Sequence, residues 1–232
     1  MHLFYQSDLH LGTHSLNEDE TRHCLQVLRH QIGDQVHITN GKGLIAKVKI
    51  ISTHSKECHF EILSNDKIIQ KSFHQHLAIA PTKQTERMEW FVEKACELDV
   101  DEISFIHTKN TERSKLKLDR LEKKTISALK QSKGGFKTII HPLVSFDTFM
   151  QHTREDPCYI ATVQPGLAHL TTYLMPQSRQ IILIGPEGDF TSDELEKALE
   201  KGYQPMSLGE KILRTETAGI MSAIAVNLIH HY

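Results

Sequence analysis

A buried strand that stops abruptly in a glycine-rich loop is the feature that most constrains the fold of this chain. Four apolar residues at 181–184 run directly into Gly-Pro-Glu-Gly at 185–188, which predicts a buried strand followed by a tight loop with exposed main chain. A second run repeats the pattern: Leu-Gly at 208–209 precedes Ile-Leu at 212–213, an arginine and a capped helix. Open α/β sheets bind ligands beyond the carboxyl ends of neighbouring strands. These loops therefore predict a ligand cleft in the last third of the chain.

The chain from about residue 76 onward alternates between strand and helix patterns. Apolar runs and helical periodicity predict strands at 77–80, 102–106, 158–163 and 180–184, and helices at 85–98, 116–131 and 216–230. A further helix begins at a capping box formed by Thr191 and Glu194, and Gly202 ends it after Lys201. Alternation of this kind predicts a mostly parallel α/β sheet.

The chain before about residue 70 reads as a small β-rich unit. Strands are predicted at 1–5, 36–39, 44–51 and 57–63, the middle two joined by a glycine-containing hairpin turn at 40–43. Asn17 is placed to cap a short helix that runs through Arg29. The polar stretch 65–73 has no clear period. We therefore predict two domains, at residues 1–70 and 74–232.

Positive charge is concentrated in one segment of an otherwise acidic chain. The formal net charge is −2, yet residues 109–137 hold ten Lys/Arg against three acidic residues, a local charge of +7. A basic stripe on an acidic body is an electrostatic footprint for phosphate. The alternative is a solvated helix face, which the charge count by itself leaves equally open.

Several classes of protein are disfavoured by what the sequence lacks. No signal peptide is indicated, no apolar stretch approaches the roughly 18 residues of a membrane helix, and the four cysteines lie far apart, which favours a cytoplasmic protein. No dinucleotide, nucleoside-triphosphate or Gly-x-Ser-x-Gly motif occurs in a suitable context. The sixteen histidines lack carboxylates or cysteines at ligand spacing, so we expect no metal site.

Ordered blocks of sequence resemble the RsmE branch of the SPOUT methyltransferases. The matching segments are residues 23–29, 83–98, 112–114, 131–132, 181–190 and 208–218. The resemblance implies a SPOUT domain with a C-terminal trefoil knot, an N-terminal PUA-like β-barrel domain that binds RNA, and a homodimer. The final helix, 216–230, is more apolar than an exposed helix should be, which also suggests packing against a second subunit.

The resemblance further implies S-adenosylmethionine-dependent methylation of N3 of a uridine in the 16S RNA of the small ribosomal subunit. A sulfonium donor that carries adenosine fits a slot of main chain and aliphatic carbon. The residues predicted to bind it are Ile184, Gly185, Pro186, Glu187, Gly188, Leu208, Gly209, Ile212, Leu213 and Thr215.

Uridine N3 attacks well only after it loses its proton, which leaves negative charge on the flanking carbonyl oxygens. Arg214 is predicted to stabilise that charge, and Glu216 or Glu187 to position or deprotonate the base. Structural roles compete for both glutamates, as a helix-terminal acid and a loop acid bonded to nearby N–H groups. The residues predicted to bind RNA are Arg29, Lys83, Arg87, Arg113, Ser114, Lys123, Gln131 and Lys133.

The chain departs from the family pattern at three places. Asp189 and Asp99 stand where the family usually has glycine, and Lys133-Gly134 stands where an arginine commonly follows. The last change affects how RNA is held more than how the cofactor is bound, because an ammonium cannot reproduce the fork of a guanidinium.

Two alternatives to the predicted reaction stay open. One is a SPOUT enzyme that modifies another rRNA or tRNA nucleoside. The other is a ribosome-binding factor that has kept the fold without the chemistry.

Overall fold

The computed structural model describes residues 2–54, 57–151, 156–175 and 179–231. The chain divides into two compact units, residues 1–70 with 126–137 and residues 71–125 with 138–232. Each unit has its own sheet. The division into independent domains at 1–70 and 74–232 stays a prediction, and Met1, part of the first predicted strand, lies outside the described residues.

The first unit is built on a four-stranded sheet in the order β1-β2-β3-β4. Strand β1 (Leu3–Tyr5) pairs in parallel with β2 (Gln35–Thr39), whereas β3 (Leu44–His54) pairs antiparallel with both β2 and β4 (Glu57–Lys67). The predicted strands and hairpin are thus present. Alternate side chains of these strands are buried, among them Ile38, as one buried face of a sheet requires.

The helix of the first unit begins where the sequence predicts it. Helix α1 (Glu18–Arg22) is capped by Asn17, whose side chain accepts a hydrogen bond from the Glu20 backbone N–H, and it continues as a π-helical segment, η1 (His23–Val27). The helix ends two residues earlier than predicted. Arg29 has a φ of 57°, a left-handed conformation that a right-handed helix cannot include.

Residues 126–137 complete the first unit, although helix α3 (Leu118–Ser132) begins in the second. The Lys137 N–H donates to the Gly41 carbonyl and the Gly43 N–H donates to the Gly135 carbonyl, each at 2.9 Å. An ion pair of 2.7 Å joins Lys130 to Glu20. The predicted hairpin turn at 40–43 is therefore held by a segment that lies far from it in the sequence.

The second unit contains a six-stranded sheet in the order β10-β8-β9-β5-β6-β7. Every pair is parallel, which confirms the predicted parallel α/β sheet. The strands are β5 (His74–Ile79), β6 (Glu102–His107), β7 (Ile139–Ser145), β8 (Cys158–Ala161), β9 (Arg179–Ile184) and β10 (Gln204–Met206). The apolar patterns did not predict β7 or β10, because each contains a proline and neither is a continuous apolar run.

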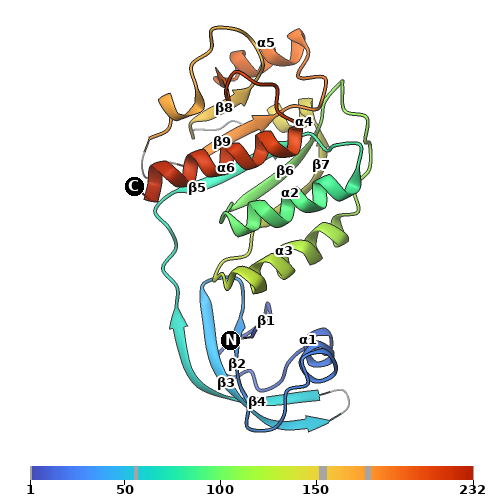
Figure 1. The fold of residues 1–232 in the computed structure, drawn as a ribbon, viewed down its shortest axis with the longest axis vertical. Helices are drawn as coiled ribbons and strands as arrows, with labels where there is room; N and C mark the ends of the chain where they lie inside the picture. Colours follow the sequence, from blue (N-terminus) through green and yellow to red (C-terminus); the bar gives the residue numbers. More distant parts are fainter. Residues whose placement is uncertain (1, 55–56, 152–155, 176–178, 232) are drawn as a thin grey trace. The chain divides into compact units, whose positions relative to one another are not determined.

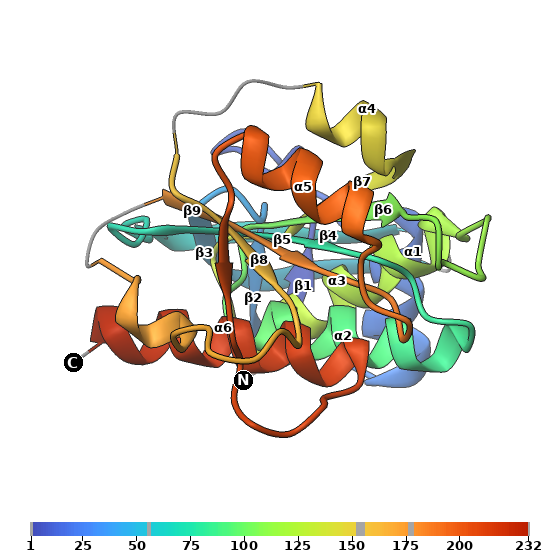
Figure 2. The same cartoon turned by 90° about the horizontal axis from the view of Figure 1, so that it is seen from above.

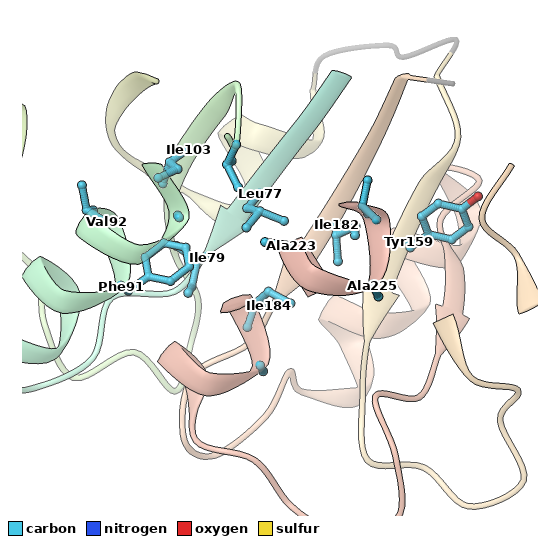
Figure 3. Packing of buried hydrophobic residues seen from close by; sticks show 14 of the residues in the cluster. Leu77, Ile79, Phe91, Val92, Ile103, Tyr159, Ile182, Ile184, Ala223 and Ala225 are labelled. Atoms are coloured by element: carbon cyan, nitrogen blue, oxygen red, sulfur yellow. The ribbon is translucent and has the colours of Figure 1, made fainter. Parts of the chain in front are cut away.

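Helices cover both faces of this sheet (Figures 1 and 2). Helices α2 (Thr85–Glu97) and α6 (Thr215–His231) pack on one face, and α4 (Phe146–Met150) and α5 (Ser192–Glu200) pack on the other. Strand β5 serves both cores, because Leu77 and Ile79 point toward α2 and α6 (Figure 3) whereas Ala78 joins the core under α4 and α5.

The predicted helices form with small shifts at their ends. The capping box of Thr191 and Glu194 is present, and Gly202 follows α5 with a φ of 83°. Sequence patterns missed the five-residue helix α4, which is too short to show a period, and the single turn η2 (Leu170–Thr172). In the described part of the chain, no helix is long and apolar enough to cross a bilayer.

Helix α6 approaches α2 closely at a glycine. A Cβ added to Gly219 would lie 2.5 Å from the ring of Phe91, which is fully buried. Other small residues on the same face of α6, such as Ala223, are also buried, whereas Met221 and Leu228 are 39% and 53% exposed. The protein's own sheet thus covers part of the apolar surface of α6, and its packing against a second subunit stays a prediction.

We expect Gly219→Ala to destabilise the protein by about 1 to 3 kcal/mol, because the added methyl group overpacks a buried, rigid ring. In a helix with free space the same change would stabilise by about 0.5 to 1 kcal/mol, so the sign of the effect distinguishes the two cases. Urea unfolding of the parent and the variant measures it.

The matched control is the double variant Phe91→Leu/Gly219→Ala. The smaller side chain makes room for the methyl group, so the cost of Gly219→Ala should shrink in that background. A Gly219→Ala protein that is more stable than the parent would contradict the close packing.

Candidate functional site

A pocket of about 980 Å³ lies at the carboxyl ends of β8, β9 and β10 in the second unit. Its walls are the loops that follow these strands, residues 161–167, 184–189 and 207–213, together with the first turn of α6. The pocket thus lies where the sequence predicted a cleft. The two predicted loops do not follow neighbouring strands, however, because β8 lies between β9 and β10. The loop after β8 therefore forms a third wall.

Main chain and aliphatic carbon make up much of the lining. Gly209 has a φ of 126°, which glycine adopts without strain and which leaves its backbone uncovered. Ile184, Leu208 and Leu213 add apolar surface, and Ile212 is 82% exposed.

Hydrogen bonds of Asp189 link the loop after β9 to the loop after β8. Its carboxylate accepts hydrogen bonds from the Thr162 hydroxyl at 2.9 Å and from the Val163 N–H at 3.2 Å. Its φ is 57°, as is that of Asp99. Both positions that depart from a family glycine are thus left-handed, and aspartate is among the few residues that tolerate this conformation.

The loop after β6 supports the same wall of the pocket. The Asn110 amide donates to the Gly188 carbonyl at 3.1 Å and to the Asp189 carbonyl at 3.0 Å, and the Lys109 N–H donates to the Glu194 carboxylate at 2.8 Å. The Gly-Pro-Glu-Gly loop is therefore bonded to two other loops. These bonds within the protein support its shape.

Negative charge exceeds positive charge around the pocket. The ionisable residues of its lining include the acidic Glu187, Asp189 and Glu210 and the basic Lys211. Glu187 and Glu210 are exposed. This balance suits a ligand that carries positive charge.

All ten residues predicted to bind the cofactor line this pocket. They come from the loops after β9 and β10 and from the start of α6. Their geometry is consistent with one ligand that contacts all three segments. Their role in binding stays a prediction.

The two predicted catalytic residues flank the pocket without belonging to its lining. Arg214 is exposed, and its carbonyl accepts the first helical hydrogen bond of α6, from Ala218, at 2.8 Å. Glu216 is buried with its carboxylate 3.7 Å from the Arg87 guanidinium. One oxygen of Glu216 has no hydrogen-bond partner among the described residues.

The residues of the second unit predicted to bind RNA lie on the carboxyl-end loops and on the helices. Arg113 donates to the carbonyls of Thr82 and Lys83, which ties the loop after β6 to the loop after β5. Lys83 pairs with Glu112 at 2.8 Å, and this hydrogen bond raises the pKa of Lys83. Arg87 contacts Glu216, whereas Ser114 and Lys123 are exposed.

The other three predicted RNA-binding residues, Arg29, Gln131 and Lys133, belong to the first unit and are exposed. Lys133 has a φ of 58° and directly follows α3. The structure thus assigns the eight residues to two groups, three in the first unit and five in the second.

Acidic residues neutralise part of the basic stripe at 109–137. Arg120 pairs with Glu89 at 2.5 Å, Lys124 lies 3.6 Å from Glu93, and Lys130 pairs with Glu20. The charge count over residues 109–137 does not include these acidic residues, because they belong to other helices. The exposed cations of the segment include Lys109, Lys115, Lys117, Lys123 and Lys133.

Sequence reasoning missed the loop after β8 and the supporting side chains. The Pro165-Gly166 pair, one residue beyond the predicted strand 158–163, was an available turn signal, and both residues line the pocket. The supporting role of Asn110 had no such signal, because its partners are backbone carbonyls distant in sequence.

Two family models match the chain. The RNA methyltransferase domain matches residues 70–227, and the RNA methyltransferase PUA domain matches residues 16–63. A curated relative, "Ribosomal RNA small subunit methyltransferase E" of Buchnera aphidicola subsp. Acyrthosiphon pisum, is 29% identical over 97% of this chain and 91% of its own length.

Solved structures with similar folds cover nearly the whole chain. A probable rRNA-methyltransferase from Porphyromonas gingivalis has a TM-score of 0.92 and 37% identity over 100% of this chain and 99% of its own. Ribosomal RNA small subunit methyltransferase E from Neisseria gonorrhoeae, bound to S-adenosyl methionine, has a TM-score of 0.90 and 25% identity over 99% and 98%. This chain therefore belongs to the RNA methyltransferase family, in the group of ribosomal RNA small subunit methyltransferase E with its N-terminal PUA domain.

Proposed function

We propose that this protein transfers the methyl group of S-adenosylmethionine to N3 of a specific uridine in 16S rRNA of the small ribosomal subunit. The observation that carries the proposal is the pocket at the carboxyl ends of β8, β9 and β10, which contains all ten residues predicted from the sequence. Family membership supplies the reaction class. The S-adenosyl methionine bound to the relative from Neisseria gonorrhoeae supports the choice of donor.

The residues of the pocket fit this donor. A volume of about 980 Å³ is at the upper end of the usual range for small-molecule sites, about 300 to 1,000 Å³. Gly209 leaves main chain open to polar edges of an adenine, and Leu208 and Leu213 offer it apolar contact. Glu187 and Glu210 complement a cationic ligand. When bound, S-adenosylmethionine supplies an electrophilic methyl group.

The acceptor requires a group that stabilises negative charge. N3 of uridine is an imide nitrogen, and its deprotonation places charge on the two flanking carbonyl oxygens. Arg214 stands between Leu213 and Thr215, both of which line the pocket, and its exposed guanidinium can donate hydrogen bonds to one of these oxygens and leave N3 open to the methyl group. We assign charge stabilisation to Arg214.

The two candidate carboxylates have different surroundings. Glu187 is exposed and lines the pocket, so it is the one placed to accept a proton from the base or to position it. Glu216 is buried against Arg87 in the first turn of α6. We therefore assign Glu216 a positioning role, in which its contact with Arg87 fixes the turn that presents Arg214.

The target uridine must be unpaired or flipped out, because N3 lies on its Watson–Crick edge. Exposed cations of the basic stripe in the second unit, among them Lys115, Lys117 and Lys123, would hold phosphates without reading sequence. The PUA domain with Arg29 would add a second RNA contact. We further propose the trefoil knot, a homodimer formed through the exposed apolar part of α6, and a cytoplasmic site of action.

Two measurements distinguish this function from its alternatives. Titration with S-adenosylmethionine separates an enzyme from a ribosome-binding factor without chemistry, which need not bind the donor. Identification of the methylated nucleoside separates uridine N3 from another rRNA or tRNA position.

Removal of the Arg214 guanidinium should slow methyl transfer and leave the binding of S-adenosylmethionine unchanged. We expect Arg214→Ala to lower the rate of methyl transfer by about 100-fold or more, the usual cost of losing one donor to a developing oxyanion. The dissociation constant for S-adenosylmethionine, measured by calorimetry, should stay within about twofold. Arg214→Lys keeps the positive charge but loses the paired N–H donors of the guanidinium, so its rate should fall between those of the parent and of Arg214→Ala. A rate for Arg214→Ala near that of the parent would remove Arg214 from the mechanism.

Releasing the loop after β9 should weaken donor binding. We expect Asp189→Ala to raise the dissociation constant for S-adenosylmethionine about tenfold, because hydrogen bonds to a charged group contribute about 1.5 to 3 kcal/mol and tenfold corresponds to about 1.4 kcal/mol. Asp193→Ala, an exposed aspartate in the first turn of α5, is the matched control and should bind like the parent. Equal affinities for all three proteins would show that the loop needs no such support.

The product should be 3-methyluridine. Small subunits from cells that lack the protein, incubated with the purified protein and labelled S-adenosylmethionine, should yield labelled nucleoside that co-elutes with a 3-methyluridine standard. Label in a ribose-methylated nucleoside would instead identify a SPOUT enzyme of another specificity.

A further inference from the structure

A second pocket, of about 410 Å³, lies in the same unit at the opposite edge of the sheet. Its lining includes His74 and His76 from the beginning of β5, Glu102 from the first position of β6, and His141 from β7. The proposed methyl-transfer site uses the carboxyl ends of other strands. This pocket is therefore separate from it and plays no part in the function proposed above.

Strand register brings three of these side chains to one face. His76 is the partner of Glu102 across β5 and β6, and His141 is the partner of Ser104, two residues further along β6. Residues paired across adjacent strands, and residues two apart along a strand, point to the same side of a sheet. Three neighbouring strands thus hold an imidazole, a carboxylate and a second imidazole together on a rigid support.

The nitrogen and oxygen atoms of His76, Glu102 and His141 that can bind a metal all lie within 4.8 Å of one another. One carboxylate oxygen of Glu102 is 2.8 Å from His141 Nε2, and the other is 3.0 Å from His74 Nε2. The His76 Nε2 is 2.8 Å from the Ser104 hydroxyl. His74 thus orients the carboxylate of Glu102 on β6, and Ser104 orients the imidazole of His76 on β5.

We propose that His76, Glu102 and His141 form a binding site for a divalent transition metal, with zinc as the ion that fits best. Two imidazoles and one carboxylate are a ligand set that zinc accepts, with bonds of about 2.0 to 2.2 Å and an open fourth position. Ligand atoms around a tetrahedral ion with such bonds are about 3.4 Å apart, so side-chain movements of up to about 1.4 Å would bring these atoms into position. Mg²⁺ and Ca²⁺ are disfavoured, because they prefer oxygen ligands.

The residues around the site would orient the metal ligands and leave a path by which an ion can enter. His74 bonds the Glu102 oxygen that does not face His141, and the Ser104 hydroxyl bonds a ring nitrogen of His76; outer contacts of this kind orient metal ligands in known sites. The side chain of His141 is 41% exposed, which gives an ion a path from solvent. The fourth position would open into the pocket.

The expectation of no metal site rested on ligand spacing along the sequence. His76 and Glu102 are separated by a helix, and His141 by a further one, so no short motif links them. Only the pairing of β5, β6 and β7 places them together. A zinc ion there would connect β5, β6 and β7 near their amino ends.

The test is a zinc titration of the full-length protein, freed of its purification tag and of metal, in competition with a chromophoric chelator at neutral pH. We expect one zinc ion to bind at micromolar concentration or below, and Mg²⁺ in excess not to displace it. His141→Ala and Glu102→Gln should each weaken zinc binding by at least about tenfold. In the parent, zinc should also raise the midpoint of thermal unfolding.

His59→Ala is the matched control, because His59 also pairs with a glutamate, Glu57, at 3.0 Å on the first unit. It should bind zinc like the parent. Substitution of Co²⁺ adds a second readout, since its visible absorption reports coordination by imidazole and carboxylate and should vanish in His141→Ala. Circular dichroism establishes that each variant is folded, and the exposure of His141 makes His141→Ala the variant least prone to unfold.

Two results would overturn the proposal. One is a parent protein that fails to compete with the chelator. The other is equal zinc affinity in the parent, His141→Ala and Glu102→Gln, which would assign binding to other histidines of the chain.

Discussion

The parallel register of six strands is the constraint on which the second unit depends. Parallel pairing places every carboxyl end at one edge of the sheet and every amino end at the other. Loops that are separated by long stretches of sequence, at 161–167, 184–189 and 207–213, therefore meet around one pocket. The same pairing gathers His76, Glu102 and His141 at the opposite edge. One set of backbone hydrogen bonds thus creates two separate groups of residues, one proposed to bind the cofactor and the other proposed to bind a metal.

Loops whose main chain must remain available to a ligand cannot be held by a ladder of backbone hydrogen bonds. Here side chains add to a few backbone hydrogen bonds, such as the one that the Ser207 N–H donates to the Ala168 carbonyl. Asp189 joins the loops after β8 and β9, Asn110 bonds the carbonyls of the Gly-Pro-Glu-Gly loop, and Glu194 both completes a helix cap and bonds the loop after β6. Such bonds reduce the conformational freedom that ligand binding would otherwise have to remove.

Local patterns predicted most of the elements that position the candidate site. The strand at 180–184, the capping box at Thr191 and the final helix depend on near neighbours in sequence, and each is present. What local patterns could not predict depends on distant partners. The place of β8 between β9 and β10, the ion pairs that neutralise part of the basic stripe, and the burial of Glu216 against Arg87 all arise from packing between elements.

The discontinuity of the first unit has a consequence for synthesis of the chain. Its hairpin turn at 40–43 bonds Gly135 and Lys137, which leave the ribosome well after residue 70. At about 5 to 20 residues per second, the intervening stretch takes about 3 to 13 s to translate. During that interval the N-terminal sheet lacks the segment that completes it, and a nascent-chain chaperone would encounter it in this unfinished form.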